Sequence, residues 1–216
     1  TNKEVLIGAD IVILAIKPQN LSSVMVELTQ NITNADLLVV SIVAGANITT
    51  LTNGLTTRNI IRVMPNTPAQ IGAGVSVWTA TSEVLPDKIE YTRQILDTLG
   101  SEIYVDDENL IDMATALSSS GPAYIFLFIE SMIDAGVYLG MPRELSRQLV
   151  LETISGSTKL VKQSERHPAE LKDMVTSPAG TTIEALLAFE KRGFRASIIE
   201  AVIAAHRRSK ALGERN

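Results

Sequence analysis

A run of hydroxyl-bearing and small residues in the second half offers the clearest chemistry in this 216-residue sequence. Ser177 opens the motif Ser-Pro-Ala-Gly, and Thr181 and Thr182 follow it directly. Glu184 lies three residues after Thr181, which is the spacing of a capping box at the start of a helix. Free backbone amides and the helix dipole attract anions at such a start, so the segment predicts a site for a small carboxylate. A well-capped helix that binds nothing explains the same residues.

Three other turns in the first half combine small residues or prolines with the ends of short apolar segments. They lie at residues 15–18, 42–45 and 64–68. Ligands of open α/β sheets bind beyond the carboxyl ends of the strands, and small residues let the backbone approach a flat ligand closely. Ordinary turn chemistry is the competing explanation, with Lys17 as a solvated surface lysine.

A dinucleotide site would normally carry the glycine-rich turn G-x-G-x-x-G after its first strand. Gly72 and Gly74 give a partial match, but a strand and not a helix is predicted after them. Either this half binds no dinucleotide, or the first strand and its glycine turn lie before Thr1. The sequence opens without an initiator methionine, so we expect that a segment precedes Thr1, but the residues leave both alternatives open.

Composition excludes several classes of protein. There are no cysteines and two histidines, which argues against thiolate chemistry and histidine-rich metal centres and suits a reducing cytoplasm. A net charge of −5 with 4% aromatic residues is poor for nucleic-acid binding. The longest uninterrupted aliphatic run spans residues 11–16, far short of a membrane span. We therefore expect a globular protein with neither nucleic acid nor membrane as partner.

Short β-branched segments alternate with helical ones in the first half, which predicts βαβ units and a doubly wound, Rossmann-like sheet. Strands are expected at residues 11–16, 37–43, 58–64, 73–79 and 101–105, with helices at 18–30 and 86–99. The strand signal stops there, so we divide the chain into a Rossmann-like domain at residues 1–105 and an all-helical domain at residues 106–216.

The second half reads as helices only. They are expected at residues 109–117, 123–139, 143–163, 168–175, 182–190 and 195–212, with a break at residues 118–122. The segment 123–139 is apolar nearly all round, so it must be buried in this chain or against a partner. We expect His167, next to Pro168, to cap a helix, and His206 to lie in a solvated basic turn.

Four segments together resemble the pyrroline-5-carboxylate reductase family: ILAIKPQ at 13–19, RVMPNTPAQIGAG at 62–74, SSSGPAYIF at 118–126 and HPAELKDMVTSPAGTTIEAL at 167–186. The resemblance implies reduction of 1-pyrroline-5-carboxylate to L-proline with NADP or NAD as the cofactor, which is the last step of proline biosynthesis. It implies a Rossmann domain followed by an all-α dimerisation domain, a homodimer that often assembles into a ring of dimers, and a cytoplasmic enzyme.

The resemblance also assigns residues to the site. It implies cofactor contacts at Asn2, Ala15, Ile16, Lys17, Pro18, Ile42, Val43, Ala44 and Glu108. It implies substrate contacts at Glu165, Ser177, Gly180, Thr181 and Thr182. Thr182 would face the ring nitrogen and act as the catalytic residue, while the loop before it would hold the carboxylate. No metal is implied.

Two departures from the family pattern matter. Ala179 stands where the family commonly has a second glycine, and its methyl group is tolerated unless the position needs a positive φ. Relative to the family, about fifty amino-terminal residues with the first strand and the glycine turn are absent, so the Rossmann-like domain is expected to be truncated. We expect this chain to bind NADPH weakly or not at all and to expose a sheet edge.

Two other functions fit parts of the sequence. A related Rossmann-type imine or hydroxyacid reductase usually carries a catalytic lysine or aspartate on the helix between its domains. The predicted helix at 123–139 has Glu130 and Asp134 but no lysine, which argues against it. Alternatively, the chain is an inactive fragment that retains only the helical dimerisation module.

Overall fold

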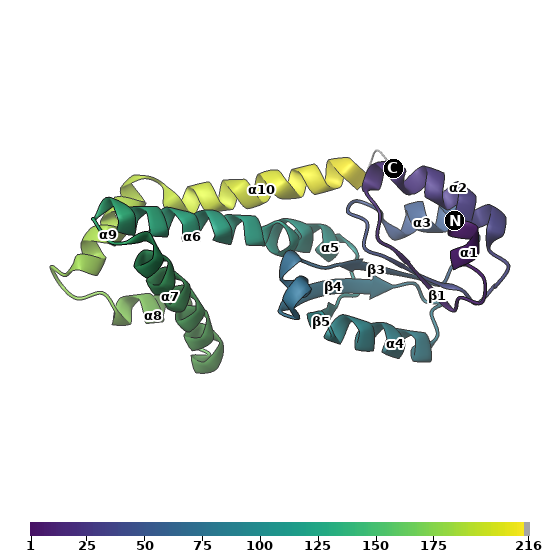
Figure 1. The fold of residues 1–216 in the computed structure, drawn as a ribbon, viewed down its shortest axis with the longest axis horizontal. Coiled ribbons are helices and arrows are strands. Elements are labelled where there is room, and N and C mark those ends of the chain that lie inside the picture. The colour runs from purple at the N-terminus through teal and green to yellow at the C-terminus, as the bar shows by residue number, and fades with distance from the viewer. Residues whose placement is uncertain (214–216) are drawn as a thin grey trace. The chain divides into compact units, whose positions relative to one another are not determined.

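The computed structural model describes residues 1–213 in two compact units. Among the described residues, one unit comprises residues 1–122 together with 202–213, and the other comprises Ala123–Ala201. The first unit holds the sheet, and the second contains helices only within its described residues (Figure 1). The division of the chain at residue 106 remains a prediction about domains.

A five-stranded sheet forms the centre of the first unit, in the order β1-β2-β3-β4-β5. Its strands are β1 (Ile11–Leu14), β2 (Leu38–Ser41), β3 (Ile60–Met64), β4 (Gly74–Ala80) and β5 (Gly100–Tyr104). All five strands were predicted from the sequence, with bounds that differ by a few residues. Strands β1, β2 and β3 are parallel, and β4 and β5 are parallel to each other.

The pairing of β3 with β4 is antiparallel, so the sheet is mixed. Only the 3₁₀ segment η2 (Thr67–Ile71) connects these two strands, and a parallel crossover needs a longer connection. Each of the other connections contains a helix. They are α2 (Leu21–Asn31) after η1 (Pro18–Asn20), α3 (Ile48–Gly54) and α4 (Pro86–Asp97), while α1 (Asn2–Val5) precedes the sheet. The sequence did not predict α1, α3 or η2.

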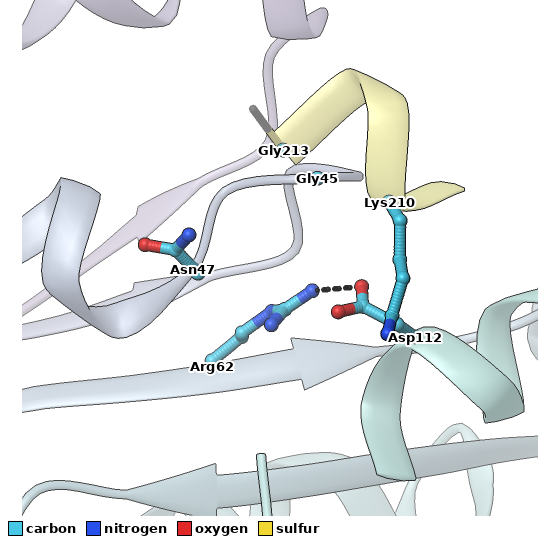
Figure 2. Close-up of a pocket in the computed structure, with 6 residues that line it drawn as sticks. All are labelled: Gly45, Asn47, Arg62, Asp112, Lys210 and Gly213. Carbon is cyan, nitrogen blue, oxygen red and sulfur yellow. Dashed lines mark hydrogen bonds and ion pairs between the residues drawn. The ribbon is translucent and has the colours of Figure 1, made fainter. Parts of the chain in front are cut away.

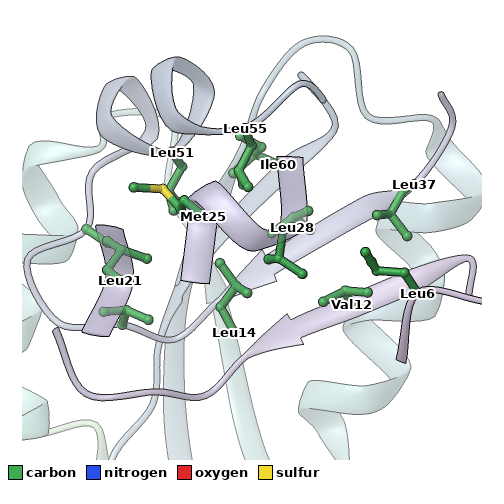
Figure 3. Close-up of a cluster of buried hydrophobic side chains, with 13 residues drawn as sticks. Leu6, Val12, Leu14, Leu21, Met25, Leu28, Leu37, Leu51, Leu55 and Ile60 are labelled. Carbon is green, nitrogen blue, oxygen red and sulfur yellow. The ribbon is translucent and has the colours of Figure 1, made fainter. Parts of the chain in front are cut away.

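Apolar side chains cover both faces of the central strands. All described residues of β2 and β3 are buried. Figure 3 shows one cluster, in which Leu21, Met25 and Leu28 of α2 pack with side chains from β1 and α3. Strand β1 is different, because Ile13 is 48% exposed while its neighbours on either side are buried. The uninterrupted apolar run at residues 11–16 predicts a strand that is buried on both faces. This prediction is wrong for β1, which is an edge strand of the described sheet.

The predicted helix break at residues 118–122 is also wrong. Helix α5 (Asn109–Ala114) continues through a π-helical turn, Thr115–Ser119, into α6 (Gly121–Tyr138). Pro122 lies directly after the π-helical turn, as the second residue of α6. The continuous run Asn109–Tyr138 is long and apolar enough to cross a membrane by length and composition alone, which the count of aliphatic residues missed.

The second unit consists of most of α6 with α7 (Arg143–Ser164), α8 (Pro168–Met174), α9 (Thr181–Lys191) and the start of α10 (Phe194–Gly213). The Ser146 hydroxyl donates to the carbonyl of Ile133 at 2.9 Å, where α7 crosses α6 closely beside Gly136. No side chain of α6 is buried in the single chain. The prediction that this helix is buried therefore fails within one copy, and burial against a partner remains.

Candidate functional site

The carboxyl ends of β1 and β2 bring together most of the residues predicted to contact a cofactor. The amide of Ile42 donates to the carbonyl of Leu14 at 3.1 Å, so the turn after β2 begins beside the turn after β1. Ala15 and Lys17 are exposed, and Ile16 is half-buried. Ala15 and Ala44 are small, and such residues let the backbone approach a planar ring system closely. The residue types at this edge therefore fit a dinucleotide.

The turn after β2 depends on a glycine. Gly45 has φ of +75°, in the left-handed region that favours glycine. A Cβ atom on this residue would lie 3.0 Å from the amide nitrogen of Gly213 and 3.1 Å from atoms of Leu212. The last turn of α10 therefore packs directly on this turn, both belonging to the first unit.

A buried ionic cluster lies beside the same turn. Arg62 is 1% exposed, and its Nη1 and Nη2 atoms donate to Glu108 at 2.7 Å and Asp112 at 2.8 Å. The same Glu108 oxygen accepts the backbone amide of Ile48 at 2.7 Å. Ser209 of α10 donates to Asp112 at 3.3 Å. Arg62 was not predicted from the sequence, and the one available signal was a single charge inside the apolar run of β3.

A small cavity of about 240 Å³ opens between these groups. Figure 2 shows it, with the guanidinium of Arg62 bonded to Asp112 below the end of α10. Its lining residues are Gly45, Asn47, Arg62, Asp112, Lys210 and Gly213. The cavity holds both signs of charge, so it does not constitute a simple anion site.

Two predicted cofactor residues have protein partners in this structure. Asn2 donates through its side-chain amide to Glu27 of α2 at 2.7 Å. Glu108 accepts bonds from Arg62 and from the start of α3, as described above. Val43 is buried, and Pro18 and Ala44 are half-buried. The cofactor contacts of all these residues remain predictions.

The hydroxyl-rich loop lies in the second unit and forms a tight turn. The amide of Gly180 donates to the carbonyl of Ser177 at 3.1 Å. Ala179 has φ of +54°, so the residue that replaces the family's glycine adopts the backbone conformation that glycine favours. A Cβ atom on Gly180 would clash with the Ser177 hydroxyl oxygen. The loop therefore depends on small residues.

The predicted capping box between Thr181 and Glu184 is wrong. Helix α9 begins at Thr181, its N-cap is Gly180, and no side chain caps it. Thr181 already has a helical backbone, so its hydroxyl is not in the N-cap position. The amides of the first turn therefore remain available to a ligand. Thr181 is exposed, and Thr182 is half-buried.

The two histidines behave differently. His167 caps α8, because its Nδ1 atom accepts the amide of Ala169 at 3.2 Å, as predicted. His206 does not lie in a solvated turn, because its Nε2 atom is buried without a hydrogen-bond partner among residues 1–213. Glu165 is exposed and ends α7 with φ of +53°.

The shifted pKa values belong to residues outside the predicted site. A hydrogen bond to Glu102 raises the pKa of Arg93, and one to Glu190 raises the pKa of Arg195, both away from the predicted site residues. Within residues 1–213, no group of three or more His, Asp or Glu side chains is placed to hold a metal ion.

Comparison with known proteins gives consistent matches along the chain. The family model described as pyrroline-5-carboxylate reductase dimerisation matches residues 108–212, and the model described as NADP oxidoreductase coenzyme F420-dependent matches residues 1–45. The pyrroline-5-carboxylate reductase of a Synechocystis species is 44% identical over 214 residues, which cover 99% of this chain and 79% of that protein. The Glycine max enzyme is 40% identical over 98% of this chain and 77% of its own length.

A solved structure is similar to this chain in both sequence and fold. The crystal structure of Plasmodium falciparum pyrroline carboxylate reductase with NADP bound has a TM-score of 0.94 and 39% identity. The match covers 99% of this chain and 80% of that one. Sequence and fold therefore agree along nearly the whole length of the chain.

Proposed function

Because the chain belongs to the pyrroline-5-carboxylate reductase family, we propose that it reduces 1-pyrroline-5-carboxylate to L-proline with NADPH or NADH. This reaction is the last step of proline biosynthesis. The observation that carries the proposal is the 44% identity to a reductase over 99% of the chain, which includes both the strand edge and the loop at 177–182. The NADP-bound relative supports the choice of cofactor.

The edge formed by residues 15–18 and 42–44 would hold the cofactor. Bound there, the reduced nicotinamide would supply a hydride to C5 of the cyclic imine. The chain's own part is to hold the two turns side by side, through the bond from the amide of Ile42 to the carbonyl of Leu14, and to let the ring approach at Ala15 and Ala44. Orienting two rings in this way can contribute about 7–11 kcal/mol at best.

The loop at residues 177–182 would hold the substrate's carboxylate. The support is the uncapped start of α9, since its free amides and the helix dipole favour an anion. The exposed hydroxyls of Ser177 and Thr181 add donors to the backbone amides around Gly180. No arginine is needed for this recognition.

Thr182 would bind the ring nitrogen of the imine. The imine is reduced more readily when it is protonated, and the product is an amine, so the nitrogen needs a hydrogen-bond partner. Thr182 lies one residue inside α9 and is half-buried, which suits a group that contacts a small ligand. Glu165 would favour positive charge on the nitrogen from the end of α7.

The proposed enzyme acts as a homodimer. The helix α6 has no buried side chain in the single chain, and Ile125, Phe126 and Leu127 are each more than half exposed. Apolar surface of this kind is covered in soluble proteins, and a second copy is the occupant that the dimerisation family model supports. A ring of such dimers and a cytoplasmic location belong to the same proposal.

An assay of cofactor oxidation tests the function. A purified protein that contains these 216 residues should consume NADPH or NADH only when 1-pyrroline-5-carboxylate is added. Formation of L-proline in equal amount is the expected result. Consumption with a β-keto acid or an aldehyde acid, the oxidised partner of a β-hydroxyacid, instead would favour the related hydroxyacid reductase. No consumption, from a protein that gel filtration shows to be a folded dimer, would favour an inactive dimerisation module.

A further inference from the structure

Arg62 lies beside the strand end that the proposed function uses. In the parallel pairing of β2 and β3, Arg62 is the partner of Ser41, the last residue of β2. Its guanidinium is buried, and a buried charge is tolerated only when it is paired and hydrogen-bonded. Glu108 and Asp112 provide that pairing at 2.7 and 2.8 Å. The arginine is therefore fixed in one orientation.

Glu108 connects the fixed side chain of Arg62 to the segment that follows β2. One of its carboxylate oxygens, Oε1, accepts both Nη1 of Arg62 and the amide of Ile48. Ile48 is the first residue of α3, so its amide has no partner within that helix. The guanidinium holds the carboxylate, and the carboxylate holds the start of α3. Gly45 lies only three residues before this point.

The opposite side of the cluster reaches α10. Asp112 accepts Nη2 of Arg62 and also the hydroxyl of Ser209. The last turn of the same helix packs on Gly45, because a Cβ atom added to that glycine would lie 3.0 Å from the Gly213 nitrogen. The turn is therefore held at its glycine by α10 and at its far end by Glu108.

We infer that Arg62 and Glu108 are positioning residues, which hold the turn at residues 44–47 in the shape that receives the nicotinamide half of the cofactor. The inference rests on the proposed function for the identity of the ligand. Glu108 acts through Ile48 and Arg62 and does not itself bind the cofactor. This differs from the cofactor contact that the family resemblance assigned to it.

The test uses Glu108→Gln, Arg62→Met and the double variant in a protein that contains the full sequence. The first readout is hydrogen exchange at the Ile48 amide, which needs no ligand. It should speed up about tenfold or more in both single variants, because the amide loses its fixed acceptor. The second readout is the dissociation constant of NADPH from a fluorescence titration, which should rise about ten- to a hundredfold in each.

The double variant separates positioning from direct contact. If Glu108 acts through Arg62, the double variant binds NADPH no more weakly than the worse single variant. If the two effects multiply, Glu108 contacts the cofactor independently and the inference is overturned. Should Arg62→Met fail to fold, Asp112→Asn replaces it in the same cycle, because Asp112 pairs with the same guanidinium.

Arg93→Gln is the matched control. It also removes an arginine from an ion pair of the first unit, that with Glu102 at 2.9 Å, but this pair is not part of the cluster. Both readouts should be unchanged in it. Unchanged exchange at Ile48 in the cluster variants would overturn the inference. A wild-type protein that forms no L-proline with either NADPH or NADH would overturn the proposed function instead, and the exchange readout would still decide whether the cluster holds the turn.

Discussion

Replacement of Gly45 by alanine tests how tightly the turn after β2 is held. The residue has φ of +75°, and this left-handed backbone costs an L-residue about 1–2 kcal/mol. Its Cβ atom would also meet the backbone of Gly213 at 3.0 Å and that of Leu212 at 3.1 Å. Such overpacking costs about 1–3 kcal/mol, so we expect a total loss of about 2–5 kcal/mol.

Gly8→Ala provides the matched comparison. Gly8 has φ of +70°, close to that of Gly45, but a Cβ atom there has no neighbour within 4 Å. This variant should lose only the backbone contribution of about 1–2 kcal/mol. The gain from a stiffer unfolded chain is common to both variants and cancels in the comparison.

Urea unfolding of the two variants and the wild type is the assay. Gly45→Ala should lose about 1–3 kcal/mol more than Gly8→Ala, with unchanged slopes. In a chain of this size the melting temperature should follow by about 2–4 °C per kcal/mol. Equal losses in the two variants would refute the packing of α10 on the turn.

Four further predictions concern the second unit. Thr182→Ala should lower turnover more than stability, and a folded variant with unchanged kinetics would remove its role at the ring nitrogen. Gly180→Ala should displace the Ser177 hydroxyl, which the added Cβ atom would clash with, and raise the KM for the imine about two- to tenfold; an unchanged KM would show that this hydroxyl is not used. Proline analogues without a carboxylate should bind more weakly than L-proline in competition assays, and equal binding would contradict carboxylate recognition by this loop. His167→Ala should cost about 1 kcal/mol in urea unfolding, because Ala169 loses its cap, and no loss would show that this cap is dispensable.

The sequence predicted β1, β2 and β3 well because each is a short apolar, β-branched run that ends at turn residues, and such signals are local. The helices of the second half were also predicted, because helical periodicity is a local signal as well. The prediction failed at residues 118–122, where serines, glycine and proline are typical of a break. The hydroxyl of Ser119 instead bonds the carbonyl of Pro65 at 2.7 Å, and a π-turn keeps the helix continuous.

The loop at 177–182 was located by its residue types, but its local geometry was not predicted. A threonine three residues before a glutamate matches a capping box, yet Thr181 is already helical and Gly180 takes the N-cap position. The spacing rule cannot tell an N-cap from the residue after it. The sequence could not predict whether Ala179 has a positive φ, because this dihedral angle depends on the turn that its neighbours form.

The buried cluster could not be predicted because its partners are remote in the sequence. Arg62 pairs with residues 46 and 50 positions away, and Ser209 is 97 positions from Asp112. No periodicity links such residues. A charge inside an otherwise apolar strand indicates that a buried partner exists, but it does not say which carboxylate provides it.

Transfer of a labelled hydride tests the central claim most directly. A protein that contains this sequence is incubated with 1-pyrroline-5-carboxylate and NADPH deuterated at both C4 positions, and the proline is analysed by mass spectrometry. We expect L-proline with one deuterium at C5. Proline without deuterium, or no proline from a folded protein that binds NADPH, would contradict the proposed hydride transfer.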